Sequence, residues 1–296
     1  MMPAISPARR LEFVMASAIS LLAMVVYVVT LCPTTDFIDA GELSTVASAL
    51  GIAHPTGYPL FTLVAWVFAH LPLPFRIVYR LNLMAAVFCA AGLFVYFRFF
   101  VHFLTAFSPG NPPSLQAREE APARRSRDGK LLPQLREKVA PRIILHVFVP
   151  AAAGTLCLGF SETYWSQAVA IEVYSMHLFL LAIVLLLFTK AIAFTASPSG
   201  SDPRRVRSYW YGFAFVLGLS FTNHMTTILL APGFLYLYFS TCGVGPSSRR
   251  RLAKLILPFL AGASLYLYLP IRAAQNPVMN WGNPVDLERF LWHFSG

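Results

Sequence analysis

Long apolar runs separated by short polar segments make up most of this chain. Several of the runs approach about 20 residues, the length that an α-helix needs to cross the hydrocarbon core of a bilayer. The pattern therefore predicts seven membrane-spanning helices, at residues 13–31, 81–104, 143–160, 176–195, 209–223, 225–242 and 253–270. An eighth apolar stretch, residues 58–72, is short for a span.

The basic residues decide whether the stretch 58–72 crosses the membrane. They include Arg9 and Arg10 near the N-terminus and a group in the linker 105–142. If residues 58–72 crossed, these two regions would lie on opposite sides. If the stretch lies in the membrane interface, both regions are cytoplasmic, as the positive-inside rule requires. We therefore predict a cytoplasmic N-terminus and an interfacial helix near residues 58–71, in the first outer loop at 32–78.

Composition supports a membrane protein and narrows its partners. The chain is 57% hydrophobic and 12% charged, whereas soluble domains are about 25% charged. The net charge of +10 would suggest a nucleic-acid partner, but the cations fall in the gaps between apolar runs, as in membrane proteins. We therefore predict an all-α polytopic membrane protein with no nucleic-acid partner. The linker 105–142, rich in Pro, Arg and Ser, is predicted to be disordered.

The predicted topology places four polar segments on the outer face, at residues 32–78, 161–175, 222–224 and 272–296. The ionisable residues of these segments include Asp36, Asp39, Glu42, His54, Glu162, Glu172, His224, Asp286 and Glu288. Ionisable groups held against a membrane are costly and usually mark a functional site. We therefore expect the protein to work at its outer face.

Asp39 and Glu42 are the first candidates for chemistry. They stand three residues apart, so on a helix they share a face. If the segment 40–51 is helical, Asp39 could be its N-cap and Glu42 the partner in a capping box. Functionally, a carboxylate in a cavity at the membrane can act as a general base toward an acceptor hydroxyl. Both interpretations fit the spacing, and either acid could be the base.

The remaining candidates each have a structural alternative. His54 lies in a turn that Pro55 and Pro59 make rigid, and it is either a hydrogen-bonded turn residue or a contact to substrate or phosphate. Glu172 begins an apolar span, so it either stabilises a helix N-terminus or binds a sugar hydroxyl.

Three further candidates lie later in the chain. Asn223 and His224 form a polar corner that a tight outer turn needs in any case. Arg272 is either a snorkelling anchor or a bidentate partner of a lipid phosphate, which we favour. Trp281 could stack on a sugar ring or belong to the aromatic belt of the membrane interface.

Several motifs are absent from the sequence. It contains no Walker A motif, no dinucleotide-binding GxGxxG, no HExxH and no cysteine–histidine metal set. The four cysteines stand too far apart for a recognisable metal site or disulfide framework. Nucleotide-driven work and the use of sugar nucleotides on a Rossmann domain are therefore not expected. We predict no cofactor and no metal ligand.

Four blocks of the chain carry a resemblance to a known family. They are residues 39–42 with 54–59 (DAGE and HPTGYP), 167–175 (QAVAIEVYS), 222–224 (TNH), and 268–272 with 280–284 (YLPIR and NWGNP). In order and spacing they resemble the GT-C superfamily, membrane glycosyltransferases that use polyprenyl-phosphate sugars. More narrowly, they resemble the membrane family, long labelled as of unknown function, that includes the plexin O-mannosyltransferase.

The chain departs from this family in two respects. Thr56 stands where the family more often has a second proline. The family also continues into further spans and often a soluble domain, so residues 1–296 are expected to be the N-terminal part of a GT-C-like transmembrane domain. A C-terminal part that binds the acceptor would lie beyond them.

The resemblance implies an inverting transfer of a sugar, expected to be mannose, from a polyprenyl-phosphate donor. Asp39 would deprotonate a serine or threonine hydroxyl of a protein or another acceptor, and Glu42 would orient the acceptor or Asp39. The lipid phosphate would leave with help from cations. Most members of the superfamily need no metal, though some use one. The residues expected to contact substrate or donor are His54, Tyr58, Glu172, Asn223, His224, Arg272 and Trp281.

The resemblance also implies a place for the reaction. The active face would be periplasmic in a bacterial inner membrane, or luminal in the endoplasmic reticulum. The rival hypothesis is a transporter of lipid-linked sugars or small solutes, which would place ionisable residues at the midplane of its spans. The predicted spans are nearly free of such residues, so the sequence favours the enzyme.

Overall fold

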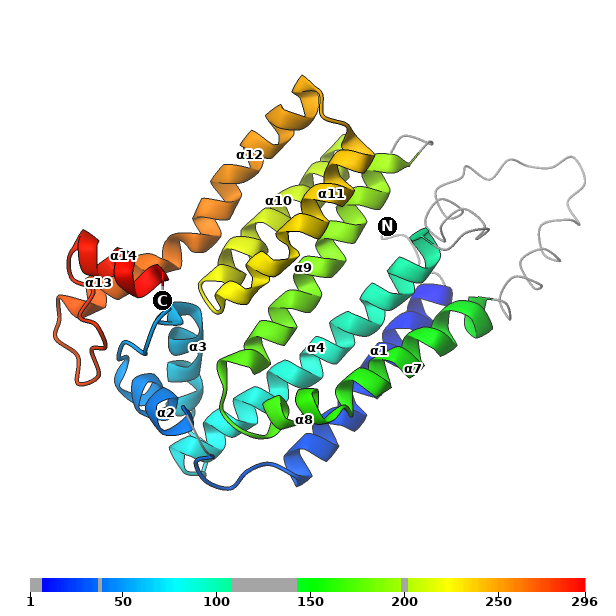
Figure 1. The fold of residues 1–296 in the computed structure, drawn as a ribbon. Helices are drawn as coiled ribbons and strands as arrows, with labels where there is room; N and C mark the ends of the chain where they lie inside the picture. The colour runs from blue at the N-terminus through cyan, green and yellow to red at the C-terminus, as the bar shows by residue number, and fades with distance from the viewer. Residues whose placement is uncertain (1–6, 37–38, 108–142, 198–201, 296) are drawn as a thin grey trace, which may run out of the picture.

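The structure is a computed structural model that describes residues 7–36, 39–107, 143–197 and 202–295. Helices make up most of this part of the chain, and long helices run side by side between two ends of the molecule (Figure 1). The long helices and helical segments are α1 (Pro7–Val29), α4 (Ile77–Phe107), η1 (Ile144–Phe148), α7 (Val149–Gly159), α9 (Val173–Ala196), α10 (Pro203–Phe221), η2 (Met225–Leu230), α11 (Ala231–Cys242), α12 (Pro246–Ala263) and η3 (Ser264–Leu267). The short helices are α2 (Ala40–Ala49), α3 (Pro59–Ala69), α8 (Glu162–Val169), α13 (Tyr268–Ala273) and α14 (Leu287–Ser295).

The number of candidate membrane spans is smaller than predicted. Five segments of the described chain are long and apolar enough to cross a membrane, and η1 and α7 with α8, bent by 61°, would make a sixth. The predicted span that is not among them is 209–223, which falls in α10; this helix is 19 residues long but begins with three arginines among its first five residues. The all-α polytopic architecture is confirmed, whereas the count of seven is not reached.

Two glycines bring α10 and α12 into close contact. A Cβ atom at Gly218 would lie 2.1 Å from the carbonyl oxygen of Phe259, and one at Gly262 would lie 2.2 Å from that of Phe215. No side chain fits in this space, so the two backbones touch. Small residues at helix crossings are typical of membrane bundles, in which close packing replaces the hydrophobic effect.

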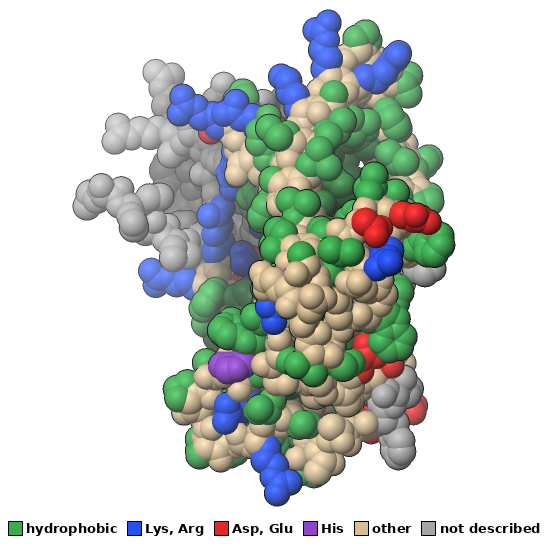
Figure 2. Space-filling model, turned by 90° about the vertical axis from the view of Figure 1, so that its left-hand side faces the viewer, with side chains coloured by type: hydrophobic (Ala, Val, Ile, Leu, Met, Phe, Trp, Pro, Cys, Tyr) green, Lys and Arg blue, Asp and Glu red, His purple; other side chains and the backbone are tan. Residues whose placement is uncertain are grey.

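Charge and apolar surface are separated along α12. Its N-terminal turns carry the exposed side chains of Arg249, Arg250 and Lys254. Further along, Leu257 is 76% exposed and Leu260 55%. Figure 2 shows this face, with Lys and Arg gathered at its upper end above a surface rich in hydrophobic side chains. The apolar part is suited to contact with lipid and the basic end to the polar interface of a membrane.

The polar segments predicted for the outer face meet at the end of the bundle that holds α2, α3 and α8 (Figure 1). The backbone N–H of Cys32 donates to the carbonyl of Val169 at 2.9 Å, and that of Ile52 donates to Met279 at 2.7 Å. Leu60 donates in the same way to Thr222 at 3.3 Å. The expectation that these segments gather at one face is therefore met by their contacts.

Asn82 of α4 links two of these segments by hydrogen bonds. Its Nδ2 donates to the carbonyls of Cys32, at 2.7 Å, and Thr34, at 3.0 Å. Its Oδ1 accepts from the backbone N–H of Ile171 at 2.8 Å. Asn82 is fully buried, so it satisfies backbone groups that would otherwise lack partners in an apolar interior.

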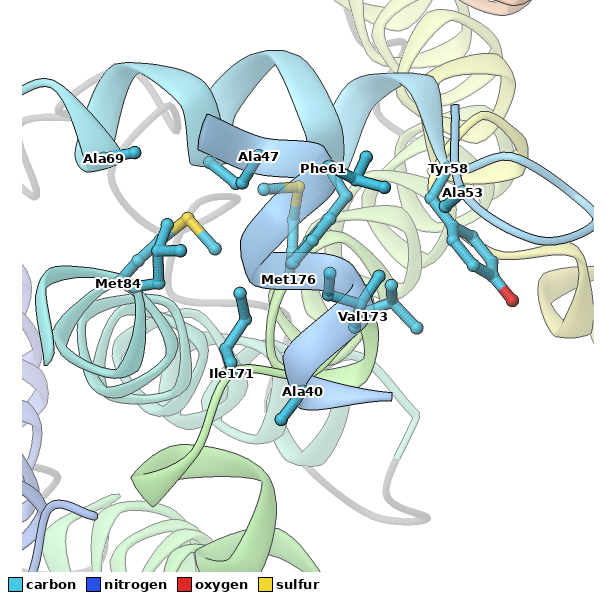
Figure 3. Close-up of a cluster of buried hydrophobic side chains, with 14 of the residues drawn as sticks. Ala40, Ala47, Ala53, Tyr58, Phe61, Ala69, Met84, Ile171, Val173 and Met176 are labelled. Carbon is cyan, nitrogen blue, oxygen red and sulfur yellow. The ribbon is translucent and has the colours of Figure 1, made fainter. Parts of the chain in front are cut away.

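A buried apolar cluster fixes α2 and α3 against α4 and α9. Figure 3 shows the side chains involved. They include Ala40, Ala47, Phe61, Met84, Ile171 and Met176. Because this face of α2 is buried, Glu42 points away from the cluster, and its side chain stays 17% exposed. The core thus positions the acidic motif.

The first outer loop folds much as predicted. α2 lies within the expected segment 40–51, and α3, an eleven-residue apolar helix, lies within 58–71. The backbone enters α3 through Tyr58, whose φ of 44° is left-handed. Most of the linker 105–142 lies outside the described residues, where the prediction of disorder is untested. Its start is helical, because α4 continues to Phe107.

Candidate functional site

Asp39 and Glu42 lie at the first turn of α2 but do not form a capping box. Asp39 occupies the N-cap position, yet its side chain makes no capping hydrogen bond. The carboxylate of Glu42 turns toward the loop that follows α2 and binds His54. The capping-box interpretation is therefore wrong: Glu42 is engaged with His54, and the carboxylate of Asp39 is left without a capping partner.

Glu42, His54 and Tyr58 form a chain of hydrogen bonds. Oε1 of Glu42 accepts from the backbone N–H of His54 at 2.8 Å and lies 3.2 Å from ring Nδ1. The hydroxyl of Tyr58 lies 3.0 Å from Nε2 of the same ring. If Nδ1–H donates to the carboxylate, Nε2 must accept from the tyrosine. Glu42 thereby fixes both the position and the tautomer of His54.

Tyr58 remains a neutral hydroxyl in this network. Burial, aided by nearby Tyr174 and then by the carboxylates of Asp39 and Glu42, raises the pKa of Tyr58 to about 12. A group with this pKa keeps its proton at neutral pH. It can therefore act as the donor that the ring of His54 requires.

Asp39 is the accessible acid of the pair. Its side chain is 42% exposed, against 17% for Glu42. Its Oδ2 lies 3.9 Å from Nε2 of His54, and its carboxylate accepts no hydrogen bond from the described residues. Asp39, Glu42 and His54 each offer one ligand atom, and these three atoms lie within 4.8 Å of one another, which is close enough to hold a metal ion. Both nitrogens of His54 also make hydrogen bonds in this network, and the prediction of no metal ligand stays untested.

Glu172 joins this group from the start of α9. It stands at the N-cap position of α9 and makes no side-chain capping hydrogen bond, and from this position a carboxylate can stabilise the helix N-terminus. Burial, followed by the charge of Asp39, raises the pKa of Glu172 to about 7. When two neighbouring carboxyl groups have different pKa values, one can accept a proton while the other carries one.

His224 reaches the same network through an aromatic contact. Its ring is parallel to that of Tyr58, with centroids 6.0 Å apart, and the ring of Tyr174 lies at 4.8 Å. Its Nδ1 accepts from the backbone N–H of Thr226 at 3.3 Å, so His224 also caps η2. Burial lowers the pKa of His224. The turn interpretation is thus correct, and it places a neutral imidazole next to Tyr58.

Asn223 and Arg272 make contacts within the chain. Asn223 is fully buried and donates to the carbonyl of Val173 at 3.1 Å. The guanidinium of Arg272 donates to the carbonyls of Leu50, at 2.7 Å, and Ala49, at 3.2 Å. It therefore satisfies the C-terminal carbonyls of α2, a favourable place for a cation. That Asn223 or Arg272 contacts a substrate stays a prediction.

Trp281 lies beside the site at the rim of a small hollow. Its side chain is 50% exposed, and its ring lies 6.2 Å from that of His54. The hollow has a volume of about 160 Å³ and is lined by Pro55, Trp281, Gly282, Arg289, Trp292 and His293. An exposed indole next to the histidine is suited to contact a sugar or a peptide.

The structure also brings in residues that the sequence patterns did not single out. They are Asn82, which holds two segments together, and the cluster of Tyr174, His177 and Thr226 around His224. Asn82 and His177 lie inside apolar runs. A lone polar residue in a membrane span is itself a signal of a structural or functional role, and this signal could have identified both residues.

Comparisons with known proteins identify the family of this chain. The model of the family described as the protein O-mannosyl-transferase TMEM260 N-terminal domain matches residues 39–244. The chain is 29% identical over 261 residues to protein O-mannosyl-transferase TMEM260 of Mus musculus, covering 86% of this chain and 30% of the relative. It is 25% identical over 282 residues to protein O-mannosyl-transferase tmem260 of Dictyostelium discoideum, covering 91% of this chain and 29% of the relative.

The chain therefore spans less than a third of the length of these relatives. The family match begins at Asp39, so it includes the acidic motif, His54, Glu172 and His224, and it ends before Arg272 and Trp281. No solved structure matches the chain at a comparable significance.

Proposed function

The chain belongs to the family of the protein O-mannosyl-transferase TMEM260 N-terminal domain, and on this premise we propose that it is the N-terminal part of an inverting GT-C-type glycosyltransferase. The sugar is mannose, the donor a polyprenyl-phosphate mannose, and the acceptor a serine or threonine hydroxyl of a protein. The reaction takes place on the periplasmic or luminal face, where α2, α3 and α8 lie, and the basic start of α12 is cytoplasmic.

The observation that carries this proposal is the accessible carboxylate of Asp39 next to a fixed Glu42–His54–Tyr58 network. Asp39 accepts the proton of the acceptor hydroxyl while that oxygen attacks the anomeric carbon. The bond from this carbon to the phosphate oxygen breaks, and the lipid phosphate leaves with the electron pair. Attack opposite the leaving group inverts the configuration.

The surrounding residues support this role of Asp39. Glu42 is committed to His54 through two contacts, so we assign it to positioning. Glu172, with a pKa of about 7, is partly protonated at neutral pH and limits the negative charge around Asp39. Trp281 offers an exposed face for the sugar or peptide next to His54.

The arrangement of charges does not favour the rival transporter. In the described candidate spans, charged side chains lie toward the helix ends. Arg98 of α4 pairs with Glu12 of α1 at 3.0 Å, and Lys190 lies in the last third of α9. A transporter of this kind would be expected to carry such groups at the midplane.

The test is mannosyl transfer by the full-length protein in membranes, from a synthetic polyprenyl-phosphate mannose to serine- and threonine-containing peptides. Asp39→Asn should reduce transfer by roughly 10²- to 10⁴-fold, the usual effect of removing a general base, while donor binding is retained. The matched control is Asp36→Asn, because Asp36 is an exposed acid of the same loop, and it should transfer normally. Equal transfer by Asp39→Asn and the wild type would remove Asp39 from the mechanism.

A further inference from the structure

A group of cations lies at the end of the long helices opposite to α2, α3 and α8 (Figure 1). Lys190 is near the end of α9. The charged groups that act most strongly on it are three cations and one acid, namely Arg98, Arg205, Arg9 and Glu12. They come from α4, α10 and α1. We call these five residues the basic cluster, and the proposed reaction uses none of them.

Glu12 neutralises one of these cations. Its Oε1 accepts from Nε of Arg98 at 3.0 Å. The side chain of Arg98 is 38% exposed, and neither of its Nη groups donates to a described residue. The carboxylate therefore holds the guanidinium on one side, and the remaining N–H groups are available to a second acceptor.

Lys190 has no anionic partner among the described residues. Its Nζ lies 5.7 Å from the centroid of the Tyr209 ring, and it makes no hydrogen bond or ion pair with the part of the chain that the structure describes. Its side chain is half-buried, and a charge held partly away from water is costly unless an opposite charge accompanies it. The face of the tyrosine ring offsets only part of this cost. Because most of its charged neighbours are also cations, Lys190 indicates a bound anion.

The surface beside the basic cluster is suited to a lipid. The guanidinium of Arg98 lies over the ring of Phe94, at 5.7 Å from its centroid, and Phe13 of α1 contacts this ring edge-on. Phe13 is 59% exposed. Further along α1, Leu21 and Val25 are also largely exposed, and only 22% of this candidate span is buried inside the molecule. The cations thus stand at the head of a continuous apolar surface.

We propose that the basic cluster binds the headgroup of an anionic phospholipid. Lys190 and the Nη groups of Arg98 donate to the phosphate oxygens, and an acyl chain lies along α1. Basic pockets between membrane helices are known to bind such headgroups, and guanidinium and ammonium groups both pair with phosphate. The proposed topology makes this end cytoplasmic, and the cytoplasmic leaflet is the one that carries anionic lipids.

The charges of the basic cluster select the kind of lipid. A zwitterionic headgroup such as phosphocholine carries a quaternary ammonium group, which Arg205 and Arg9 would repel. A headgroup with a net negative charge is attracted by all the cations. A soluble anion would pair with Lys190 but would leave the apolar surface of α1 unused. The site lies at the other end of the bundle from Asp39, so it is separate from the proposed reaction.

The test is native mass spectrometry of the full-length protein in detergent, titrated with phosphatidylglycerol or with phosphatidylcholine. The wild type should bind phosphatidylglycerol more tightly. Lys190→Gln should lower the affinity for phosphatidylglycerol by about tenfold, as expected for loss of one hydrogen bond to a charged group, and Lys190→Arg, which keeps the charge, should retain it. The matched control is Lys254→Gln, which removes an exposed lysine of α12 at the same end of the molecule and should bind normally.

The thermal stability of Lys190→Gln separates a lipid from a partner within the chain. Without lipid, the variant loses a charge that has no counter-ion, so its Tm in lipid-free detergent should not fall. A fall would show that Lys190 is paired within the protein and would overturn the proposal.

The remaining outcomes concern the ligand. Equal affinity of Lys190→Gln and the wild type for phosphatidylglycerol would overturn the site. Equal binding of the two lipids by the wild type would overturn the selection for an anion, and displacement of the lipid by inorganic phosphate would replace the lipid with a soluble anion. None of these readouts depends on mannosyl transfer, so failure of the proposed function would leave the lipid site standing.

Discussion

Replacing Glu42 with glutamine tests whether this acid positions His54 or is itself the base. The glutamine oxygen can still accept the backbone N–H of His54, which lies 2.8 Å from Oε1. It cannot offer a negative charge to ring Nδ1 at 3.2 Å. The substitution therefore keeps the loop in place and weakens only the contact that orients the imidazole.

The structure sets the size of the expected effect. A hydrogen bond to a charged group contributes about 1.5–3 kcal/mol, and one between neutral groups about 0.5–1.5 kcal/mol. Glu42→Gln should therefore lose about 1 kcal/mol, which corresponds to roughly a fivefold lower kcat/KM. Asp39→Asn should lose far more, because it removes the proton acceptor itself.

The assay is the initial rate of mannosyl transfer to a peptide over a range of donor concentrations, with the full-length protein. The matched control is Glu162→Gln, which neutralises an exposed acid on α8 at the same end of the molecule and should leave the rate unchanged. A loss as large as that of Asp39→Asn would refute the reasoning and make Glu42 the base. A wild-type rate would show that the contact to His54 does not matter for transfer.

Two further predictions concern the residues around the site. Asn82→Leu should lower the free energy of unfolding by about 3 kcal/mol, because it breaks three hydrogen bonds and leaves the buried N–H of Ile171 without an acceptor. Equal Tm values for Asn82→Leu and the wild type in thermal unfolding would contradict this prediction. Burial raises the pKa of Glu172 from 4.5 to about 7, so between these pH values the folded protein binds more protons than the unfolded chain, and its stability should fall as the pH rises from about 5 to 7. Glu172→Gln should flatten this part of the dependence of Tm on pH. An unchanged profile would contradict the raised pKa of Glu172.

The sequence alone predicted the class of the protein and much of its outer end. The apolar runs are long enough to span a membrane, so the all-α polytopic fold followed from hydrophobic periodicity and length. The positive-inside pattern predicted that four distant polar segments share one face, and in the structure these segments contact one another, for example through the hydrogen bond from Ile52 to Met279. Asp39, Glu42 and His54 are close in sequence, so their grouping in one loop could be anticipated.

The number of spans shows the limit of hydropathy. The segment 209–223 is apolar enough to predict a span, but the helix that contains it, α10, begins at Pro203 and includes three arginines in its first turns. The bend of 61° between α7 and α8 was also not visible in the pattern. Hydropathy reports how a segment is solvated, whereas helix ends and bends depend on capping and packing.

The roles of the site residues were decided by the tertiary structure. Glu42 could have capped α2, and only the return of the loop placed His54 within its reach. Arg272 donates to Leu50 at the end of α2, 222 residues earlier in the chain, and the ring of Tyr58 packs against that of His224 from another helix. Which polar partners a side chain finds depends on how distant segments pack, and local periodicity carries no information about that packing.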